Sequence, residues 1–193
     1  MGYQHRFLDG SSANLPTGKI ICVGRNYADH AAELNNPIPT EPMLFIKPST
    51  SVVDMSAPFS VPEGFGDVHF ETEMAVLIGK RLSHASLSEA EDAIVGIGLG
   101  LDLTLRELQG KLKEKGHPWE KSKAFDGSCP LSAFVKSESI SDIQNVEVCL
   151  WVNGELRQKG NSAMMLNKVL ELISHSSEFF TLEPGDVLLT GTP

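Results

Sequence analysis

Two glutamates separated by one residue give the clearest chemical signal in the sequence. Glu71 and Glu73 stand in the segment His69-Phe-Glu-Thr-Glu, immediately before the apolar run 74–78. Residues two apart in a β-strand point to the same face, with Cα atoms about 7 Å apart. The apolar run indicates a strand buried on both faces, where two carboxylates would repel each other and resist the loss of water. A bound cation would remove both penalties, so the pair predicts a cation site.

A third carboxylate, Asp102, interrupts another apolar run at 98–104. Three carboxylates without a His or Cys cluster favour a hard ion with oxygen ligands, Mg²⁺ first and Mn²⁺ as the alternative. The competing interpretation places Glu71 and Glu73 on a solvated strand edge and makes Asp102 the N-cap of a helix that begins near Thr104. Spacing alone does not decide between them. The position of all three acids against apolar runs favours the cation.

His30 and Glu33 form a second candidate group, three residues apart in a segment that could be helical. Residues at this spacing are neighbours on a helix. A carboxylate beside an imidazole can fix the tautomer of the ring and raise its basicity, as a general base requires. On sequence alone, an ordinary surface His–Glu pair is the simpler explanation of this spacing.

Several other polar residues could contact a ligand. Lys121 and Lys123 lie in the segment 119–126, and a lysine in a pocket could neutralise a developing oxyanion. Both could also be ordinary solvated lysines. The remaining candidates lie near the ends of expected elements or in the turn-like tripeptide that ends the sequence, and they are Arg25, Arg106, Gln109 and Thr192.

The elements that must position these residues form a mostly β, α+β pattern. Short apolar runs bounded by Gly, Pro, Asn or Asp predict strands at 19–24, 43–46, 74–78, 93–97, 146–152 and 186–189. Asn153-Gly154 predicts a tight hairpin turn. Helices are expected at 28–34, 104–115 and 167–180, with Gly116 as a stop and a capping box beginning at Ser88. A regular βαβ alternation is absent, which disfavours a doubly wound sheet.

Length and charge narrow the class of protein. The 193 residues, 41% of them hydrophobic, suit a single catalytic domain over 1–193. The net charge of −9 argues against nucleic acid as a partner. Three widely spaced cysteines argue against disulfides and zinc and fit a reducing compartment. No signal peptide or membrane-spanning stretch is visible, so we expect a cytoplasmic protein with no membrane partner.

Taken in order, five segments resemble the fumarylacetoacetate hydrolase family. They are similar to its motifs G-x-N-Y-x-x-H, E-x-E, D-x-[ST]-x-R, K-x-F-D and G-D-[VI]-[IL]-x-T-G-T-P, and they lie at 24–30, 69–73, 101–106, 121–126 and 185–193. The segments 24–27, 118–119 and 152–158 are most similar to the small acylpyruvate hydrolase and oxaloacetate decarboxylase group within the family. The resemblance covers nearly the whole chain.

The resemblance implies a mixed β-sandwich roll with a few short helices, paired as a homodimer, and a divalent metal held by Glu71, Glu73 and Asp102. His30 and Glu33 would form a dyad on a lid, and Lys123 would be the cation beside the metal. Arg25, Arg106, Gln109 and Thr192 would contact a small 2-oxo acid substrate. The family continues past Gly-Thr-Pro with further strands, so a chain ending at Pro193 would leave a sheet edge exposed.

The activity that the resemblance implies is hydrolysis of a carbon–carbon bond in acylpyruvate-type 2,4-dioxo acids, with oxaloacetate decarboxylation at the same site. One alternative is a 2-oxo acid tautomerase or isomerase, such as a 2-hydroxyhepta-2,4-diene-1,7-dioate isomerase, which needs the same metal-held enolate but no water attack. The other alternative is a catalytically inactive protein that binds a metal or ligand.

Overall fold

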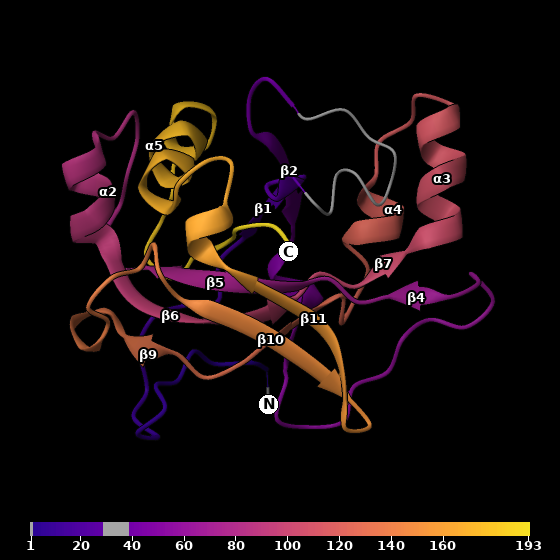
Figure 1. The fold of residues 1–193 in the computed structure, drawn as a ribbon, viewed down its shortest axis with the longest axis horizontal. Helices are drawn as coiled ribbons and strands as arrows, with labels where there is room; N and C mark the ends of the chain where they lie inside the picture. Colours follow the sequence, from indigo (N-terminus) through magenta and orange to yellow (C-terminus); the bar gives the residue numbers. More distant parts are fainter. Residues whose placement is uncertain (1, 29–38) are drawn as a thin grey trace.

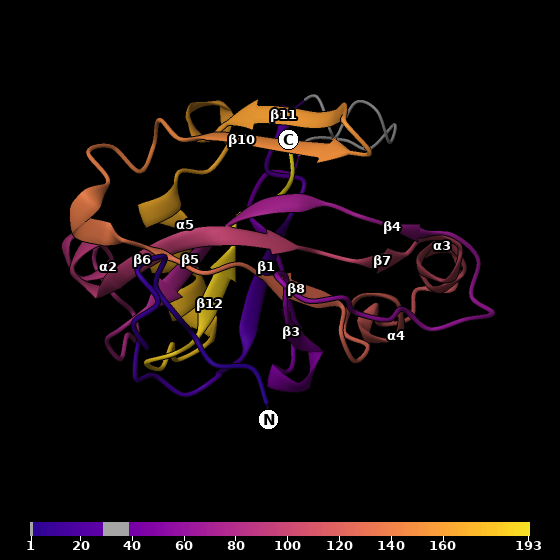
Figure 2. The same cartoon turned by 90° about the horizontal axis from the view of Figure 1, so that it is seen from below.

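The computed structural model of the chain describes residues 2–28 and 39–193. An eight-stranded mixed sheet forms its centre, and Figures 1 and 2 show how the sheet curls. Strands β1 and β12 are parallel, as are β3 and β8, and the other neighbours in the sheet are antiparallel. The order across the sheet is β2 (Met43–Lys47), β1 (Ile20–Gly24), β12 (Val187–Leu189), β5 (Thr72–Ile78), β6 (Ile94–Leu101), β8 (Cys129–Leu131) and β3 (Val52–Asp54), with β9 (Val135–Lys136) also paired to β6.

Within the described ranges, two small sheets and four helices surround this centre. The hairpin of β10 (Glu147–Val152) and β11 (Glu155–Asn161) lies over one face, and β4 (Val68–His69) pairs with β7 (Thr104–Leu105). Helices α2 (Leu87–Ala93) and α5 (Val169–Phe179) lie at one end, and α3 (Arg106–Glu114) and α4 (Glu120–Lys123) at the other (Figure 1). Short 3₁₀ turns occupy Ser49–Ser51, Ser137–Ser139 and Ser162–Met164. No helix in the described ranges has the length and apolarity needed to cross a membrane.

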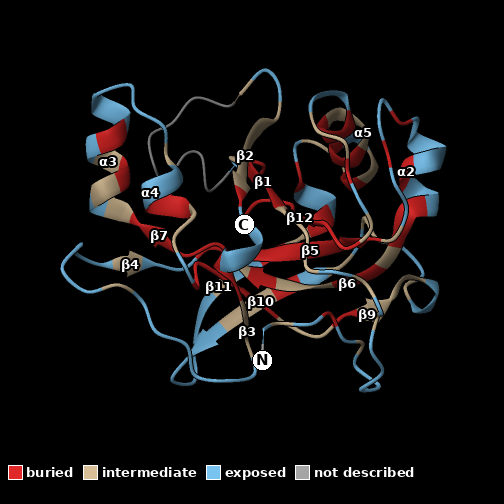
Figure 3. Ribbon diagram, turned by 180° about the vertical axis from the view of Figure 1, so that it is seen from behind, coloured by how far each residue is buried: buried red, intermediate tan, exposed pale blue. Residues whose placement is uncertain are grey.

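Strand β5 is the centre of the core, as its apolar run predicts. All seven of its residues are buried, and Figure 3 shows this strand and its neighbours in red. Its side chains alternate between two hydrophobic clusters, with Ala75 and Leu77 in one and Met74 and Val76 in the other. Because both faces are covered, a polar residue can reach a pocket from this strand only near its end.

The register of β5 and β6 brings two acidic residues together. Thr72 pairs with Leu101 in the antiparallel ladder, so Glu71 directly precedes β5 where Asp102 directly follows β6. The backbone N–H of Asp102 donates to the carbonyl oxygen of Glu71 at 2.8 Å. The two residues are 31 positions apart in the sequence, and the sheet makes them neighbours.

Most predicted elements are confirmed, with shifted ends. The strand expected at 93–97 continues to Leu101, and the strands β3, β4, β8 and β9 were missed. The helix expected from Thr104 begins only at Arg106, because Thr104–Leu105 pairs with Val68–His69 as a short strand. Gly116 adopts φ of +64° just beyond the end of α3, as expected of a helix stop. Asn153 and Gly154 both have positive φ in the predicted hairpin turn. The helix expected at 28–34 falls almost entirely outside the described residues.

The capping box predicted at Ser88 is wrong by two residues. Ser86 is the N-cap of α2, and its hydroxyl accepts from the backbone N–H of Glu89 at 3.3 Å. The Glu89 carboxylate in turn accepts from the backbone N–H of Ser86 at 2.9 Å. The predicted box would have paired Ser88 with Glu91, whereas the box that forms pairs Ser86 with Glu89, which has the same spacing of three residues.

This cap yields a stability prediction. Ser86→Ala should lower the free energy of unfolding by about 1 kcal/mol, because the first turn of α2 loses its side-chain acceptor. Chemical denaturation of the metal-free protein measures the change. Ser88→Ala is the matched control, since Ser88 is exposed inside the helix and should change stability by only a few tenths of a kcal/mol. The reverse order of the two effects would contradict the assignment of the cap.

Candidate metal centre and active site

Glu71, Glu73 and Asp102 meet at the end of the central sheet. Each offers a carboxylate oxygen that lies within 4.8 Å of one from each of the others. The three residues are only 8%, 2% and 1% exposed, respectively, so the alternative of a solvated strand edge is wrong. The alternative of Asp102 as a helix cap is also wrong, because the N-cap of α3 is Leu105 and no side chain caps it.

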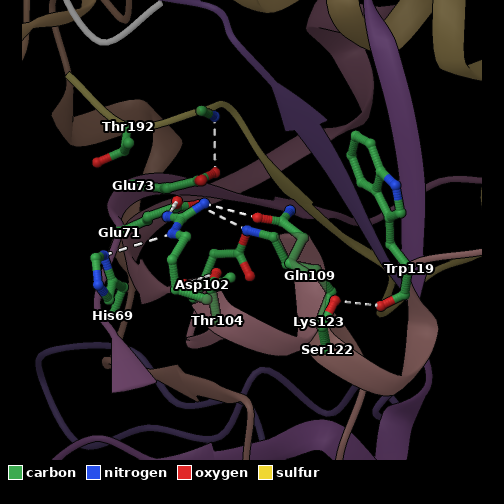
Figure 4. Close-up of polar contacts among 12 residues, drawn as sticks. His69, Glu71, Glu73, Asp102, Thr104, Gln109, Trp119, Ser122, Lys123 and Thr192 are labelled. Carbon is green, nitrogen blue, oxygen red and sulfur yellow. Dashed lines mark hydrogen bonds and ion pairs between the residues drawn. The ribbon is translucent and has the colours of Figure 1, made fainter. Parts of the chain in front are cut away.

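Three basic side chains compensate two of these carboxylates. The Lys123 ammonium lies between Glu71 and Asp102, with its Nζ 2.7 Å from a Glu71 oxygen (Figure 4). Arg106 forms an ion pair with Glu71. The fully buried Lys47 ammonium lies 2.8 Å from Asp102 Oδ1 and also donates to the carbonyl oxygen of Ser128 at 3.1 Å. Helices α3 and α4 and strand β2 therefore all converge on the acidic group.

The third carboxylate, Glu73, has a different environment. It accepts a hydrogen bond from the backbone N–H of Gly191 at 2.7 Å, and no lysine, arginine or histidine in the described ranges forms an ion pair with it. Gly191 reaches this position with φ of +92°, and a Cβ there would come within 2.8 Å of the Asn26 side chain. Glycine is thus required where the end of the chain approaches the site.

The environments shift the pKa values of two carboxyls in opposite directions. Burial opposes ionisation of Glu71, but Lys123 and Arg106 outweigh it and lower its pKa to about 2. Burial, together with the charges of Asp102 and Glu71, raises the pKa of Glu73 well above its ordinary range. The Lys123 pKa is raised because Asp102 and Glu71 outweigh the effect of its burial. Lys123 is therefore a firmly held cation.

These residues fit a divalent cation. Ionised Glu73 would be a buried charge without an ion-pair partner in the described part of the chain, and such a charge calls for a cation. An all-carboxylate donor set suits Mg²⁺ or Mn²⁺ better than softer metals. The acidic triad can therefore hold a divalent metal.

A pocket with about 480 Å³ of empty space, part of it open to solvent, adjoins the triad. Its lining includes every predicted ligand-contact residue, Arg25, Arg106, Gln109 and Thr192, together with Lys123. Arg106 Nη1 donates to Gln109 Oε1 at 2.7 Å, which orients the amide. Arg25 adopts φ of +58°, which is uncommon for a residue other than glycine. His30 and Glu33 lie outside the described residues, so their predicted dyad stays a prediction.

Sequence reasoning missed two lysines, Lys47 and Lys113, and the residue pattern did not distinguish Lys121 from Lys123, although the resemblance implied Lys123. Lys123 is buried and Lys121 exposed, although both lie in α4. Lys47 ends the apolar strand β2, and the argument applied to Asp102 could have found it. Lys113 lines the pocket and follows Arg106 and Gln109 by seven and four residues, a spacing that places all three on one helix face.

The chain is similar to known proteins over nearly its whole length. A family model described as "Fumarylacetoacetate (FAA) hydrolase C-terminal" matches residues 19–193. The chain is 51% identical to the oxaloacetate tautomerase YcgM of Escherichia coli (strain K12) over 192 residues, which are 99% of this chain and 88% of that protein. It is similar to the crystal structure of a putative fumarylacetoacetate hydrolase family protein from Yersinia pestis CO92, with a TM-score of 0.97, 50% identity and coverage of 99% and 88%.

A third comparison concerns a metal complex. The crystal structure of fumarylpyruvate hydrolase from Pseudomonas aeruginosa in complex with Mn²⁺ and pyruvate has a TM-score of 0.92 and 36% identity to this chain. The similarity covers 100% of this chain and 84% of that one.

Proposed function

Because this chain belongs to the fumarylacetoacetate hydrolase family, we propose that it is a divalent-metal enzyme that interconverts the keto and enol tautomers of oxaloacetate or a similar 2-oxo dicarboxylate. The observation that carries the proposal is the buried triad Glu71, Glu73 and Asp102 beside the Lys123 ammonium. The identity of 51% to an oxaloacetate tautomerase over nearly the whole chain supports this choice of substrate class.

Glu71, Glu73 and Asp102 would hold Mg²⁺ or Mn²⁺. When bound, the ion supplies Lewis-acid polarisation of a 2-oxo group. Lys123 acts beside it as a hydrogen-bond donor, since its raised pKa keeps it protonated. An ammonium at this place stabilises the negative charge that grows on the substrate oxygen as the C3 proton leaves. The same cationic state rules Lys123 out as the base.

His30, oriented by Glu33, is the proposed proton acceptor at C3, on the sequence argument alone. In the tautomerisation the proton leaves C3 and a proton is delivered to the C2 oxygen, so that C2–O becomes a hydroxyl and C2–C3 a double bond. No bond of the carbon skeleton breaks and no water is consumed. This step needs one acid–base group near C3 and a cationic environment for the oxygen.

The lining of the pocket suits a substrate with a second carboxylate. Arg25, Arg106 and Lys113 all line it, although the chain as a whole has a net charge of −9. Burial lowers the pKa of Lys113, and the nearby charges of Arg25 and Arg106 lower it further. Cations that line the same pocket and repel one another attract an anion there. A dicarboxylate would place one carboxylate toward the metal site and the other toward Arg25 and Lys113, since Arg106 is already paired with Glu71.

This charge arrangement predicts a substrate-dependent effect. Lys113→Met should raise KM for oxaloacetate about 10-fold and change kcat little, because one ion pair to the distal carboxylate is lost. With acetylpyruvate, which has a single carboxylate, KM should change much less. Steady-state kinetics with both substrates measures the difference. Lys111→Met, an exposed position on the same helix, is the control, and an equal rise of KM for both substrates would contradict the role of Lys113.

A hydrolase is the second candidate, favoured by the similarity to the fumarylpyruvate hydrolase of Pseudomonas aeruginosa. There His30 would take a proton from water, and the water would attack the distal carbonyl of an acylpyruvate. The C3–C4 bond would break and pyruvate would leave as its enolate. With oxaloacetate the same site could instead release carbon dioxide, which needs no water attack. His30→Ala should therefore reduce hydrolysis more than decarboxylation.

One set of assays on the purified protein with Mg²⁺ or Mn²⁺ separates these activities. Accelerated loss of the enol absorbance of oxaloacetate without fragments supports the tautomerase. Pyruvate with carbon dioxide indicates a decarboxylase, and pyruvate with acetate from acetylpyruvate indicates a hydrolase. Metal binding without any turnover would contradict an enzymatic function and support a binding protein. The homodimer stays a prediction from the resemblance.

A further inference from the structure

A hairpin outside the pocket is joined to the site through one side chain. Gln158 lies in β11 and is half-buried, and Figure 2 shows β10 and β11 beside the C-terminal end of the chain. Its amide oxygen accepts from the backbone N–H of Thr72 at 3.0 Å, and its amide nitrogen donates to the Thr192 hydroxyl at 2.8 Å. Thr72 stands between Glu71 and Glu73, and Thr192 lines the pocket.

These contacts close into a ring. The Thr192 hydroxyl donates to the carbonyl oxygen of Thr72 at 2.9 Å, so Thr72 both begins and ends the sequence of hydrogen bonds. A backbone N–H can only donate and a carbonyl oxygen can only accept. The direction of every bond is therefore determined, running from the Thr72 N–H through Gln158 and Thr192 to the Thr72 carbonyl.

The direction of these hydrogen bonds determines which partners the Thr192 hydroxyl can have. Its hydroxyl has one proton, which the Thr72 carbonyl accepts, and one of its two lone pairs accepts from Gln158. Figure 4 shows this hydroxyl turned away from the Glu73 carboxylate. While the ring is closed, the Thr192 hydroxyl cannot donate to a ligand. Gly191, its neighbour, donates to Glu73 at 2.7 Å, so the ring also holds that donor in place.

We infer that Gln158 is a positioning residue of the active site. It ties the β10–β11 hairpin to the peptide between two of the proposed metal ligands and fixes the direction of the Thr192 hydroxyl. This inference rests on the proposed metal site of Glu71, Glu73 and Asp102, and it adds to that site a residue that does not touch metal or substrate. Partners that orient ligands in this way commonly change metal affinity when they are lost.

The first test is Gln158→Met, which keeps the length of the side chain and removes both hydrogen bonds. The affinity of the metal-free protein for Mn²⁺ alone, measured by titration, should fall about 10-fold. The matched control is Gln144→Met. Gln144 is also a half-buried glutamine that bridges two backbone groups, the Val169 N–H and the Ser162 carbonyl, and none of its hydrogen bonds among the described residues reaches the triad, Thr72 or Thr192. It should lower the thermal unfolding temperature without changing Mn²⁺ affinity.

The second test uses a pH profile, which a purely structural role would not produce. In Gln158→Glu the protonated carboxyl can replace both amide contacts, because it has one acceptor and one donor. The ionised carboxylate cannot donate to Thr192, so the ring opens. The Mn²⁺ affinity of this variant relative to the wild type should be low at about pH 8 and recover toward about pH 5, near the ordinary range of a carboxyl group.

Several outcomes overturn the inference. Unchanged Mn²⁺ affinity in Gln158→Met would do so, as would an equal loss in Gln144→Met. Tighter Mn²⁺ binding by Gln158→Glu at pH 8 would show that only its added charge matters. If Gln158→Met does not fold, the pH profile of Gln158→Glu still decides. A wild type that binds Mn²⁺ without turnover would contradict the proposed function while leaving the affinity comparison valid.

Discussion

Glu73→Gln is expected to abolish metal-dependent turnover, with a loss of about 10³-fold or more. The amide removes one of three carboxylates that would hold the divalent ion, and the ion's Lewis-acid contribution of several kcal/mol corresponds to a rate factor of this size. The affinity for Mn²⁺ should fall in parallel, and titration of the metal-free protein measures it without relying on activity. The effect is large because Glu73 has no ion-pair partner among the described residues that could compensate its charge in place of the metal.

The same variant should stabilise the metal-free protein at neutral pH. The raised pKa of Glu73 means that the folded state holds a proton more tightly than the unfolded state, whose value is near 4.5. Its favourable contribution is complete below pH 4.5 and is lost as the pH rises through the folded-state pKa. Glutamine carries no charge to bury, so the unfolding temperature of Glu73→Gln should exceed that of the wild type by more at pH 8 than at pH 5.

Glu63→Gln provides the control, because Glu63 is exposed and the substitution removes the same formal charge. It should leave Mn²⁺ affinity and turnover unchanged. A Glu73→Gln protein that binds Mn²⁺ as tightly as the wild type would refute the assignment of Glu73 as a ligand. Chelation of the wild type with EDTA should reproduce the loss of turnover, and added Mg²⁺ or Mn²⁺ should restore it.

Lys123→Met is expected to damage both stability and catalysis. The ammonium bridges Glu71 and Asp102 inside the protein, and removal of one member of a buried ion pair costs about 3–5 kcal/mol because the partner charges stay buried. Because Arg106 and Lys47 still pair with these acids, we expect the free energy of unfolding to fall by about 3 kcal/mol. Turnover should fall about 10²–10³-fold, as for the loss of one donor to a developing oxyanion.

The loss of stability in Lys123→Met depends on pH, because Lys123 is paired with the Glu71 carboxylate. Its pKa is lowered from 4.5 to about 2, so its pairing stabilises the fold above pH 4.5 and this contribution is lost as the pH falls through about 2. The difference in unfolding free energy between wild type and Lys123→Met should therefore be constant from about pH 6 to 8 and narrow below pH 4.5. Denaturant unfolding at several pH values measures it.

Lys121→Met is the matched control, since Lys121 is the exposed lysine of the same short helix. It should change stability by no more than about 0.5 kcal/mol. Mn²⁺ should recover part of the stability lost in Lys123→Met, because a cation at the triad replaces the missing charge. A Lys123→Met protein as stable and active as Lys121→Met would refute the assignment of Lys123 to the site.

The acidic group and the class of fold could be predicted before any coordinates were known. Glu71, Glu73 and Asp102 are each placed against an apolar run, and strand periodicity and the cost of burying charge are local properties that can be evaluated without coordinates. The same reasoning predicted the strand 74–78 and the hairpin at Asn153, because patterning and turn chemistry are also local.

The neighbours of these acids could be identified only in the folded chain. The residue pattern did not distinguish Lys123 from Lys121, although the resemblance implied Lys123, and the structure shows Lys123 buried and Lys121 exposed. The structure also adds Lys47 and Lys113, moves the cap from Ser88 to Ser86, and joins Gln158 to the site. Lys123 lies 52 residues from Glu71, and Gln158 lies 86 from Thr72. Contacts at such separations depend on strand register and on which faces pack together, and they arise only when the entire sheet has folded.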